Sequence, residues 1–329
     1  MAVLPPDPVF CMRANDMGAV NCICFHSTER LFSGTAKGAV YLWDMQTCRS
    51  PLHFSIGSEP VTSIYHGEET LVTQQKGGIL KRWHIANAGY VLDSTNDTNH
   101  IGFCRFATDD DDRIYYPSND NEICIGKLNI DDDDQTMTLN PKGILDERKE
   151  PPGVNAQQLG SLMCMKPVTI SNQLYLLAGY ESGIFLTWDL RTASIINVTT
   201  LEECPIAFDF CSEANRGIYG NTTDKLGIFG YQRNNDVKLI NRGDISIKNA
   251  GINCVRIRKD QKVFSTGGND GRVRVFSWKS LRPLTVLTEH RAAVNDIAYS
   301  PGKVDLWKSP IMACASTDGV ISLWNLYNN

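Results

Sequence analysis

Near its end the chain places His290, Ser316 and Asp318, the residue types of a nucleophilic hydrolase. In such an enzyme the carboxylate orients a histidine, which takes the proton from the attacking serine. The surrounding residues alternate between apolar and polar types, with Asp318-Gly319 as a tight turn between two short strands. This setting favours a buried hydrogen-bond chain that ends on the ring nitrogen of Trp324. His290, Ser316, Asp318 and Trp324 are therefore predicted to be a structural tetrad, not a catalytic set.

The strand that carries Trp324 recurs along the chain, and its copies indicate the architecture. The copies are GAVYLWDM (38–45), GGILKRWHI (77–85), NEICIGKL (121–128), SGIFLTWDL (182–190), DKLGIFGY (224–231), NDGRVRVFSW (269–278) and the final GVISLWNL (319–326). Most steps are near the ~40–45 residues of a WD repeat. One such sheet cannot bury both of its faces alone, so repeats of this kind stack. Seven copies predict an all-β, seven-bladed WD40 β-propeller. A strand within residues 8–13 is predicted to close it by joining the last blade.

The repeats predict one domain over residues 1–329, because a closed set of blades forms a single unit. The step between the third and fourth copies is longer than the others. Within it, residues 131–157 begin with four consecutive aspartates and contain Pro141, Pro151 and Pro152. We expect this acidic segment to be a flexible, exposed insertion after the third blade.

Several classes of function are disfavoured by what the sequence lacks. It contains no phosphate-binding P-loop, no HExxH, no GxSxG and no metal-type spacing of cysteine and histidine, so we expect no enzyme, no cofactor and no small-molecule substrate. The net charge of −5 argues against direct nucleic-acid binding. The start resembles no secretory signal and no stretch is apolar enough for a membrane span. Eleven cysteines without a CxxC pair indicate reduced thiols, and hence a cytoplasmic and nuclear location.

Candidate partner contacts lie in turns and insertions. Tyr180, Glu181 and Asn269 occupy turns where propellers often present binding residues. Trp307 lies in an inserted loop, where it either packs on the blade or forms a binding hot spot. The acidic run Asp131, Asp132, Asp133 and Asp134 is either a solvated loop or a contact for a basic partner.

Five segments carry a resemblance to one family. They are PPDPVF (5–10), GFCRF (102–106), LLAGYESGIFLTWDL (176–190), RVRVFSWKSLRPLTVLTEHRAAV (272–294) and ISLWNLY (321–327). Together they resemble the G-protein β-subunit-like protein 1 family, whose fungal relatives are called ASTRA-associated protein 1. The resemblance implies a non-enzymatic scaffold or adaptor. It would act as a co-chaperone factor with the TTT complex in the maturation and stability of PI3K-related protein kinases, which serve DNA-damage and growth signalling.

Two further functions remain as alternatives at this point. The family's ASTRA relatives suggest a chromatin-associated subunit, or a propeller that binds histone tails, in an ASTRA-like remodelling assembly. A true G-protein β subunit would carry a long heptad-patterned helix before its propeller, and only a few proline-rich residues precede the first strand here. No G-protein γ subunit is therefore expected as a partner. The expected partners are TTT subunits, PI3K-related kinases and chromatin-complex subunits.

Overall fold

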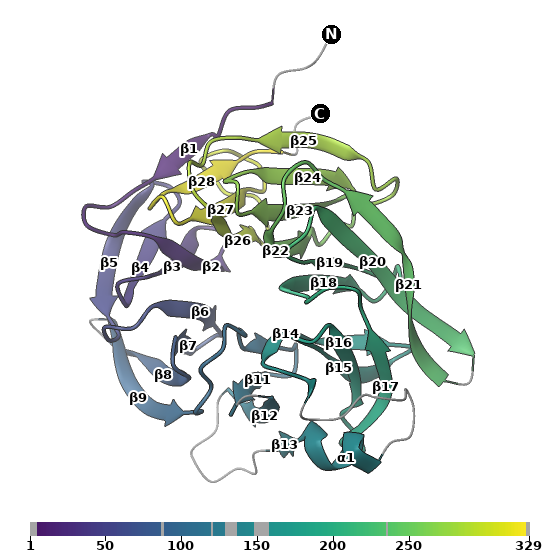
Figure 1. Cartoon of the computed structure of the whole chain (residues 1–329). Helices are drawn as coiled ribbons and strands as arrows, with labels where there is room; N and C mark the ends of the chain where they lie inside the picture. The colour runs from purple at the N-terminus through teal and green to yellow at the C-terminus, as the bar shows by residue number, and fades with distance from the viewer. Residues whose placement is uncertain are drawn as a thin grey trace. The chain divides into compact units, whose positions relative to one another are not determined.

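The computed structural model describes residues 5–86, 89–119, 121–128, 137–147, 158–234 and 236–326. Within these ranges the strands form seven four-stranded sheets, which we number as blades 1 to 7 in chain order (Figure 1). In six blades each strand lies beside the next along the chain. Blade 7 takes one strand from the start of the chain, in the order β1-β28-β27-β26. The predicted seven-bladed, all-β fold is confirmed.

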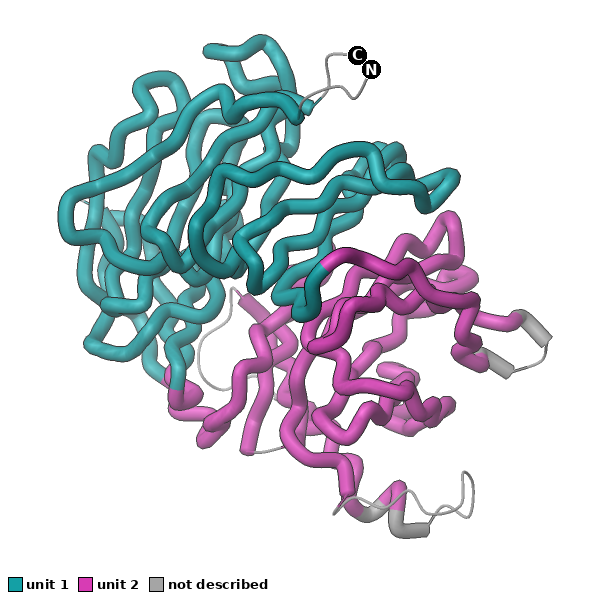
Figure 2. The backbone as a smooth tube through the Cα atoms, turned by 45° about the horizontal axis from the view of Figure 1, so that its top comes forward, with its two compact units in different colours: residues 1–76, 80–95, 249–329 teal, residues 77–79, 96–248 magenta. Residues whose placement is uncertain are grey.

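The chain divides into two compact units (Figure 2). Unit 1 comprises Met1–Lys76, Leu80–Thr95 and Asn249–Asn329, and it holds blades 1, 2, 6 and 7. Unit 2 comprises Gly77–Ile79 and Asn96–Lys248, and it holds blades 3, 4 and 5. The assignment of residues 1–329 to a single domain stays a prediction.

Each of the four blades of unit 1 contains four strands, and β1 is one of the four in blade 7. Blade 1 contains β2 (Val20–Ser27), β3 (Arg30–Thr35), β4 (Ala39–Asp44) and β5 (Arg49–Ser55). Blade 2 contains β6 (Val61–His66), β7 (Thr70–Gln75), β8 (Ile79–Ala86) and β9 (Gly89–Asp97). Blade 6 contains β22 (Ile252–Ile257), β23 (Val263–Gly268), β24 (Val273–Ser277) and β25 (Pro283–Leu287). Blade 7 contains β26 (Val294–Tyr299), β27 (Met312–Ser316), β28 (Ile321–Trp324) and β1 (Phe10–Met12).

The blades of unit 2 also contain the one helix found in the described residues. Blade 3 contains β10 (Ala107–Thr108), β11 (Arg113–Ser118), β12 (Glu122–Lys127) and β13 (Met137–Leu139), and α1 (Pro141–Glu147) follows it. Blade 4 contains β14 (Leu162–Ile170), β15 (Gln173–Tyr180), β16 (Ile184–Asp189) and β17 (Ser194–Thr200). Blade 5 contains β18 (Ala207–Cys211), β19 (Arg216–Gly220), β20 (Lys225–Asn234) and β21 (Asp236–Ser246).

The burial of each strand follows from how its faces are covered. All six residues of β16 are buried, because the sheets of blades 3 and 5 cover the two faces of blade 4. All six residues of β23 are buried as well. The outer strand β5 alternates exposed and half-buried residues along its whole length. Each apolar cluster accordingly joins two neighbouring blades: Leu71 packs with Phe32 between blades 2 and 1, and Leu176 packs with Tyr115 between blades 4 and 3. Facing sheets are thus the source of the core.

The acidic insertion differs in part from the prediction of an exposed loop. Its residues 137–147 form β13 and α1, and Leu139 and Leu145 are both 1% exposed. Met137, Thr138 and Leu139 pair with β12, so this short apolar alternation supplies the outer strand of blade 3. The polar residues around it hide that strand in the sequence. Residues 131–136 and 148–157 lie outside the described ranges.

The N-terminal strand joins the last blade as predicted. β1 runs antiparallel to β28, with Phe10 opposite Leu323 and Met12 opposite Ile321. Met12 is 0% exposed and belongs to a cluster shared by blades 7 and 1, whereas Phe10, at the start of the strand, is 44% exposed. β1 therefore contributes both edge pairing and core packing.

We expect Met12→Ala to lower the free energy of unfolding by about 2–5 kcal/mol, because it leaves a cavity in a buried cluster. Phe10→Ala is the matched control on the same strand and should cost much less, since its ring is largely in solvent. Thermal melts of both variants test this. Equal losses of stability would contradict the packing role of β1.

His66 at the end of β6 is held neutral in an aromatic cluster. Its ring lies 3.8 Å from that of His26 and 5.3 Å from that of Phe32, measured between centroids. One ring nitrogen, Nδ1, hydrogen-bonds the carbonyl of Gly67, and Nε2 is 2.9 Å from the hydroxyl of Tyr90. Burial, with a smaller effect of His26, lowers the pKa of His66 from its usual value to about 4. Protonation of His66 must therefore oppose folding.

This pKa predicts a loss of stability as the pH falls from about 6.5 to about 4, because the unfolded chain then binds a proton that the folded protein rejects. His66→Gln should flatten that part of the pH–stability curve. His53→Gln removes an exposed histidine from β5 and should keep the wild-type slope. Melting temperatures measured from pH 7 to pH 4 for the three proteins would decide the matter, and parallel curves would contradict the assignment.

Candidate functional site

Blade 7 contains an unbroken chain of four hydrogen-bonding side chains, of which Trp324, Ser322 and His290 are buried and Asp318 is half-buried. Trp324 Nε1 donates to Ser322 Oγ at 2.7 Å, and Ser322 Oγ lies 2.7 Å from His290 Nε2. On the other side of the ring, His290 Nδ1 is 3.2 Å from a carboxylate oxygen of Asp318. Every donor meets an acceptor if the serine hydroxyl donates to a neutral imidazole.

Electrostatics keep this chain in that protonation state. Burial lowers the pKa of His290 and outweighs the opposing effect of Asp318. Burial also resists ionisation of Asp318, but the backbone N–H of Arg291 and the facing histidine outweigh it and lower the pKa of the carboxyl. The order aspartate, histidine and serine is that of a hydrolytic triad, but Ser322 is 0% exposed and its Oγ also accepts from Trp324 Nε1, so a substrate cannot reach the hydroxyl.

The structure corrects one member of the predicted tetrad. Three of the predicted residues, His290, Asp318 and Trp324, are brought together, but the serine between them is Ser322. The hydroxyl of Ser316 instead donates to the carbonyl of Ala292 at 3.0 Å and accepts from the backbone N–H of Asp318 at 3.2 Å. Cys314 occupies the position on β27 at which blades 1 and 2 place a hydroxyl acceptor for the tryptophan. Ser322, which lies directly opposite Cys314 on β28, accepts the hydrogen bond from Trp324 instead.

The same strand register recurs in the other blades. Counted back from the key aromatic residue, the second residue pairs with the tenth across the two strands. In blade 1, where Trp43 is the aromatic, Tyr41 therefore pairs with Ser33. In blade 1 Trp43 Nε1 donates to Ser33 Oγ at 2.8 Å. In blade 2 Trp83 Nε1 donates to Thr73 Oγ1 at 2.9 Å. The position ten residues before the tryptophan therefore supplies the acceptor for its ring nitrogen.

Blades 4 and 6 each lack one half of this pair. In blade 4 the acceptor position is Ala178, and the buried Nε1 of Trp188 has no hydrogen-bond partner among the described residues. In blade 6 the aromatic is Phe276, and the buried hydroxyl of Thr266 opposite is likewise unpaired within the described part of the chain. The two blades are complementary exceptions to one rule.

In blade 5 every member of the network is replaced. Phe229 stands at the tryptophan position, and Tyr219, paired with Gly227, stands at the hydroxyl position. Thr223 takes the place of Asp318, since each accepts the backbone N–H two residues later. Leu201 takes the place of His290, because its carbonyl faces Gly183 as that of His290 faces Gly271.

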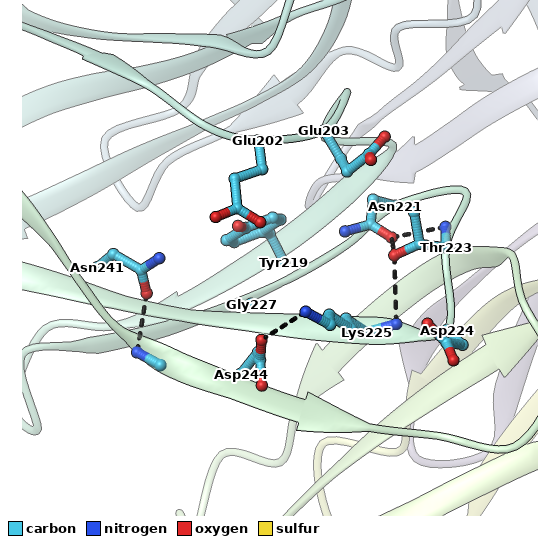
Figure 3. A pocket seen from close by; sticks show the side chains of 11 residues that line it. Glu202, Glu203, Tyr219, Asn221, Thr223, Asp224, Lys225, Gly227, Asn241 and Asp244 are labelled. Carbon is cyan, nitrogen blue, oxygen red and sulfur yellow. Dashed lines mark hydrogen bonds and ion pairs between the residues drawn. The ribbon is translucent and has the colours of Figure 1, made fainter.

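A pocket of about 230 Å³ lies at this position of blade 5 (Figure 3). Its lining residues share polar or charged side chains and include Glu202, Glu203, Tyr219, Asn221, Asp224, Lys225 and Asp244. The tyrosine ring covers Gly227, where a Cβ would lie 2.0 Å from the ring carbons. Sequence reasoning did not find this pocket; the degenerate motif DKLGIFGY was its one visible sign.

The predicted contact residues of blade 4 separate into a core residue and a surface residue. Tyr180 is 0% exposed and donates from its hydroxyl to the carbonyl of Asn121 at 3.2 Å. It cannot reach a partner, and the prediction that it does so is wrong because β15 is buried on both faces. Glu181 is exposed and accepts the backbone N–H of Ser161 at 3.2 Å.

The other predicted contacts lie in separate places. Asn269 is exposed at the turn after β23, where its backbone N–H donates to the carbonyl of Gly251. Trp307 is half-buried and packs against the cluster of blades 7 and 1, while the neighbouring Leu306 is 52% exposed. Asp131, Asp132, Asp133 and Asp134 lie outside the described residues. No single site gathers these positions, and their role in binding stays a prediction.

An exposed apolar pair was also missed. Ile101 is 75% exposed and Phe103 is 68% exposed, in the segment before β10. This segment has no strand pairing up to Ala107, so alternate apolar residues are not turned into the core. Exposed large apolar side chains of this kind are common at protein contacts.

Metal and membrane sites were also sought in the structure. Over the described ranges, no group of three or more histidine, cysteine, aspartate or glutamate side chains is arranged to hold a metal ion. None of the helical structure in those same ranges is both long and apolar enough to cross a membrane.

Sequence comparison identifies repeats and full-length relatives. The model of the WD domain, G-beta repeat, matches residues 7–44, 244–277 and 281–325. The mouse guanine nucleotide-binding protein subunit beta-like protein 1 is 28% identical, over 98% of this chain and 97% of its own length. ASTRA-associated protein 1 of Schizosaccharomyces japonicus is 23% identical, and that of Schizosaccharomyces pombe 24%, each over 98% of this chain and 99% of the relative.

Comparison with solved structures supports the fold. The β-propeller domain of Cps50 (Swd1) from Myceliophteria thermophila matches with a TM-score of 0.76 and 14% identity. The match covers 98% of this chain and all of that domain. At this identity the likeness establishes the propeller architecture alone.

The unpaired indole of blade 4 predicts a stabilising substitution. Ala178→Ser should raise the free energy of unfolding by about 0.5–1.5 kcal/mol, because its hydroxyl can accept from Trp188 Nε1 as Ser33 does from Trp43. Ala315→Ser, at another fully buried alanine, has no such donor to meet and should not stabilise. Chemical denaturation of both variants checks this. A destabilised Ala178→Ser protein would show that the site cannot take a hydroxyl.

Proposed function

We propose that this chain, which carries WD40 repeats and has full-length homologues named ASTRA-associated protein 1, is a non-enzymatic adaptor in the cytoplasm and nucleus. It acts as a co-chaperone factor with the TTT complex in the maturation and stability of PI3K-related protein kinases. Through these clients it serves DNA-damage and growth signalling.

The observation that carries this proposal is the extent of the similarity. The match to the mouse and fission-yeast relatives spans 98% of this chain and nearly all of each relative, so it includes the loops as well as the repeats. A similarity confined to the repeats would support the fold only. The name of the fungal relatives, ASTRA-associated protein 1, states an association with ASTRA, which fits an adaptor.

The chemistry of blade 7 is consistent with a role without catalysis. The histidine, serine and aspartate that resemble a hydrolytic set are joined by hydrogen bonds that end on a tryptophan ring. His290 is 6% exposed and Ser322 is 0% exposed, so a substrate could not reach either side chain. These residues hold the blade together.

The exposed pair Ile101 and Phe103 supports a surface that engages proteins. Both side chains are more than two-thirds exposed, and they lie two residues apart beside the buried Cys104. The turn is therefore anchored while its apolar side chains face outward. Burial of one such side chain by a partner stabilises a complex by about 1.5–3 kcal/mol.

Affinity purification of the tagged protein from cells, followed by quantitative mass spectrometry, tests the proposal. Wild type should recover TTT subunits and PI3K-related kinases. We expect the double variant Ile101→Ser with Phe103→Ser to recover several-fold less of both, because it removes exposed apolar contact area.

The matched control is Leu284→Ser with Val286→Ser, which removes a second exposed apolar pair from the outer strand β25. It should retain wild-type recovery. Recovery of histones and remodelling subunits without TTT would overturn the co-chaperone role in favour of the chromatin alternative. Stoichiometric recovery of a G-protein γ subunit would contradict both.

A further inference from the structure

The pocket of blade 5 lies beside the place of the blade 7 network and shares three of its positions, Tyr219, Thr223 and Gly227. In blade 7, His290, Ser322 and Trp324 fill this position and satisfy one another. In blade 5 the corresponding residues Leu201, Gly227 and Phe229 offer no polar side-chain atom. Polar groups at the rim therefore face an open volume of about 230 Å³ instead of a completed network.

Two buried residues, Asn221 and Tyr219, each present to this volume one polar group that has no protein partner. Asn221 is 3% exposed, and its Oδ1 accepts from the backbone N–H of Thr223 at 2.8 Å and from the threonine hydroxyl at 2.7 Å. These bonds fix the amide so that Nδ2 faces the pocket interior (Figure 3). Neither this Nδ2 nor the hydroxyl of Tyr219, itself 6% exposed, has a hydrogen-bond partner among the described residues. Neither atom is among the shielded unpaired atoms of the described residues, so both are open to the pocket and available to a ligand.

The lining of the pocket is predominantly acidic. Glu202, Glu203, Asp224 and Asp244 contribute four carboxylates, and the single cation is Lys225, whose Nζ lies 3.3 Å from Asp244. Burial and then the nearby Glu202 and Asp244 raise the pKa of Tyr219. The pKa of Lys225 is raised as well, first by its hydrogen bond to Asp244. Nearby carboxylates contribute to both shifts, after burial for Tyr219 and together with the hydrogen bond for Lys225.

We propose that the acidic pocket of blade 5 binds an arginine side chain presented by a protein partner. The guanidinium has five N–H donors and no acceptor, so it suits a site with several carboxylates around one opening. The same residue supplies a main-chain carbonyl, which is the acceptor that Asn221 Nδ2 lacks. This binding does not depend on which assembly the chain joins.

Other ligand classes fit these groups less well. A nucleic acid would bring phosphates against four carboxylates. A bare metal ion would leave the Asn221 amide without an acceptor, and the described residues contain no metal-type cluster. A lysine ammonium shares the charge but offers a compact head with three donors, and one ammonium is already present as Lys225.

NMR titration of the full chain with the peptide acetyl-Gly-Arg-Gly-amide tests the proposal. Resonances of Asn221, Thr223 and Gly227 should shift in a saturable way, and the shifts should weaken at high salt. Two matched peptides replace the arginine. One carries citrulline, which keeps the shape of arginine without its charge, and the other carries lysine, which keeps the charge without the planar array of N–H donors. Both should bind several-fold more weakly.

Two variants with opposite expected effects make the test independent of damage to the fold. The double variant Glu202→Gln with Asp244→Asn should weaken binding roughly three- to tenfold, whereas Lys225→Met removes the competing cation and should strengthen it several-fold. Glu68→Gln, an exposed carboxylate in blade 2, is the control and should leave affinity unchanged. Equal binding of the citrulline peptide, equal binding of the lysine peptide, or weaker binding to Lys225→Met would each overturn the assignment.

Discussion

A tryptophan N–H buried between facing sheets requires an acceptor, and this constraint organises the blades. An unpaired buried donor costs about 1–3 kcal/mol, so the strand register has to bring an oxygen to the ring. The register does so by placing the residue ten before the aromatic opposite the residue two before it, as with Ser33 and Tyr41 in blade 1. Blade 7 meets the same constraint differently, because Cys314 occupies the acceptor position and Ser322 across the strand takes over, with His290 and Asp318 behind it.

The constraint can be relaxed where apolar packing offsets the loss. Trp188 keeps its ring fully buried beside Ala178 although its N–H is unpaired, which indicates that the burial of a large aromatic outweighs one missing hydrogen bond. In blade 6 the stacked rings of Phe264 and Phe276, 4.8 Å apart, replace the indole while the hydroxyl of Thr266 remains. Each exception retains one half of the tryptophan–hydroxyl pair, and the pairing of the strands is kept although the hydrogen bond is absent.

The fold could be predicted from the sequence because every blade repeats one alternation of apolar and polar residues, mostly at a similar spacing. This holds even where the tryptophan position is occupied by Gly126 or Phe229. The site residues were less predictable from the sequence than the fold. Alternation cannot show whether a residue such as Tyr180 faces the core or a turn, since inner strands are buried on both faces. The choice between Ser316 and Ser322 depends on which side of a strand pair faces the histidine, and this is a property of packing. The short strand of residues 137–139 is hidden by its polar surroundings.

The pocket of blade 5 had no positive sequence signal, because it arises from what a degenerate repeat has lost. Its loss of the network is tolerated since Phe229 lies within an aromatic cluster with Phe185, Phe208 and Phe210, at centroid distances of 5.8, 6.1 and 5.7 Å. Packing of these aromatic rings thus holds the strands of blade 5 in place. The polar residues that line the pocket are then not needed for the stability of the blade. The Nδ2 of Asn221 and the hydroxyl of Tyr219 then face the pocket instead of a protein partner. A repeat protein can in this way form a specific site in a blade whose stability no longer depends on the residues that line it.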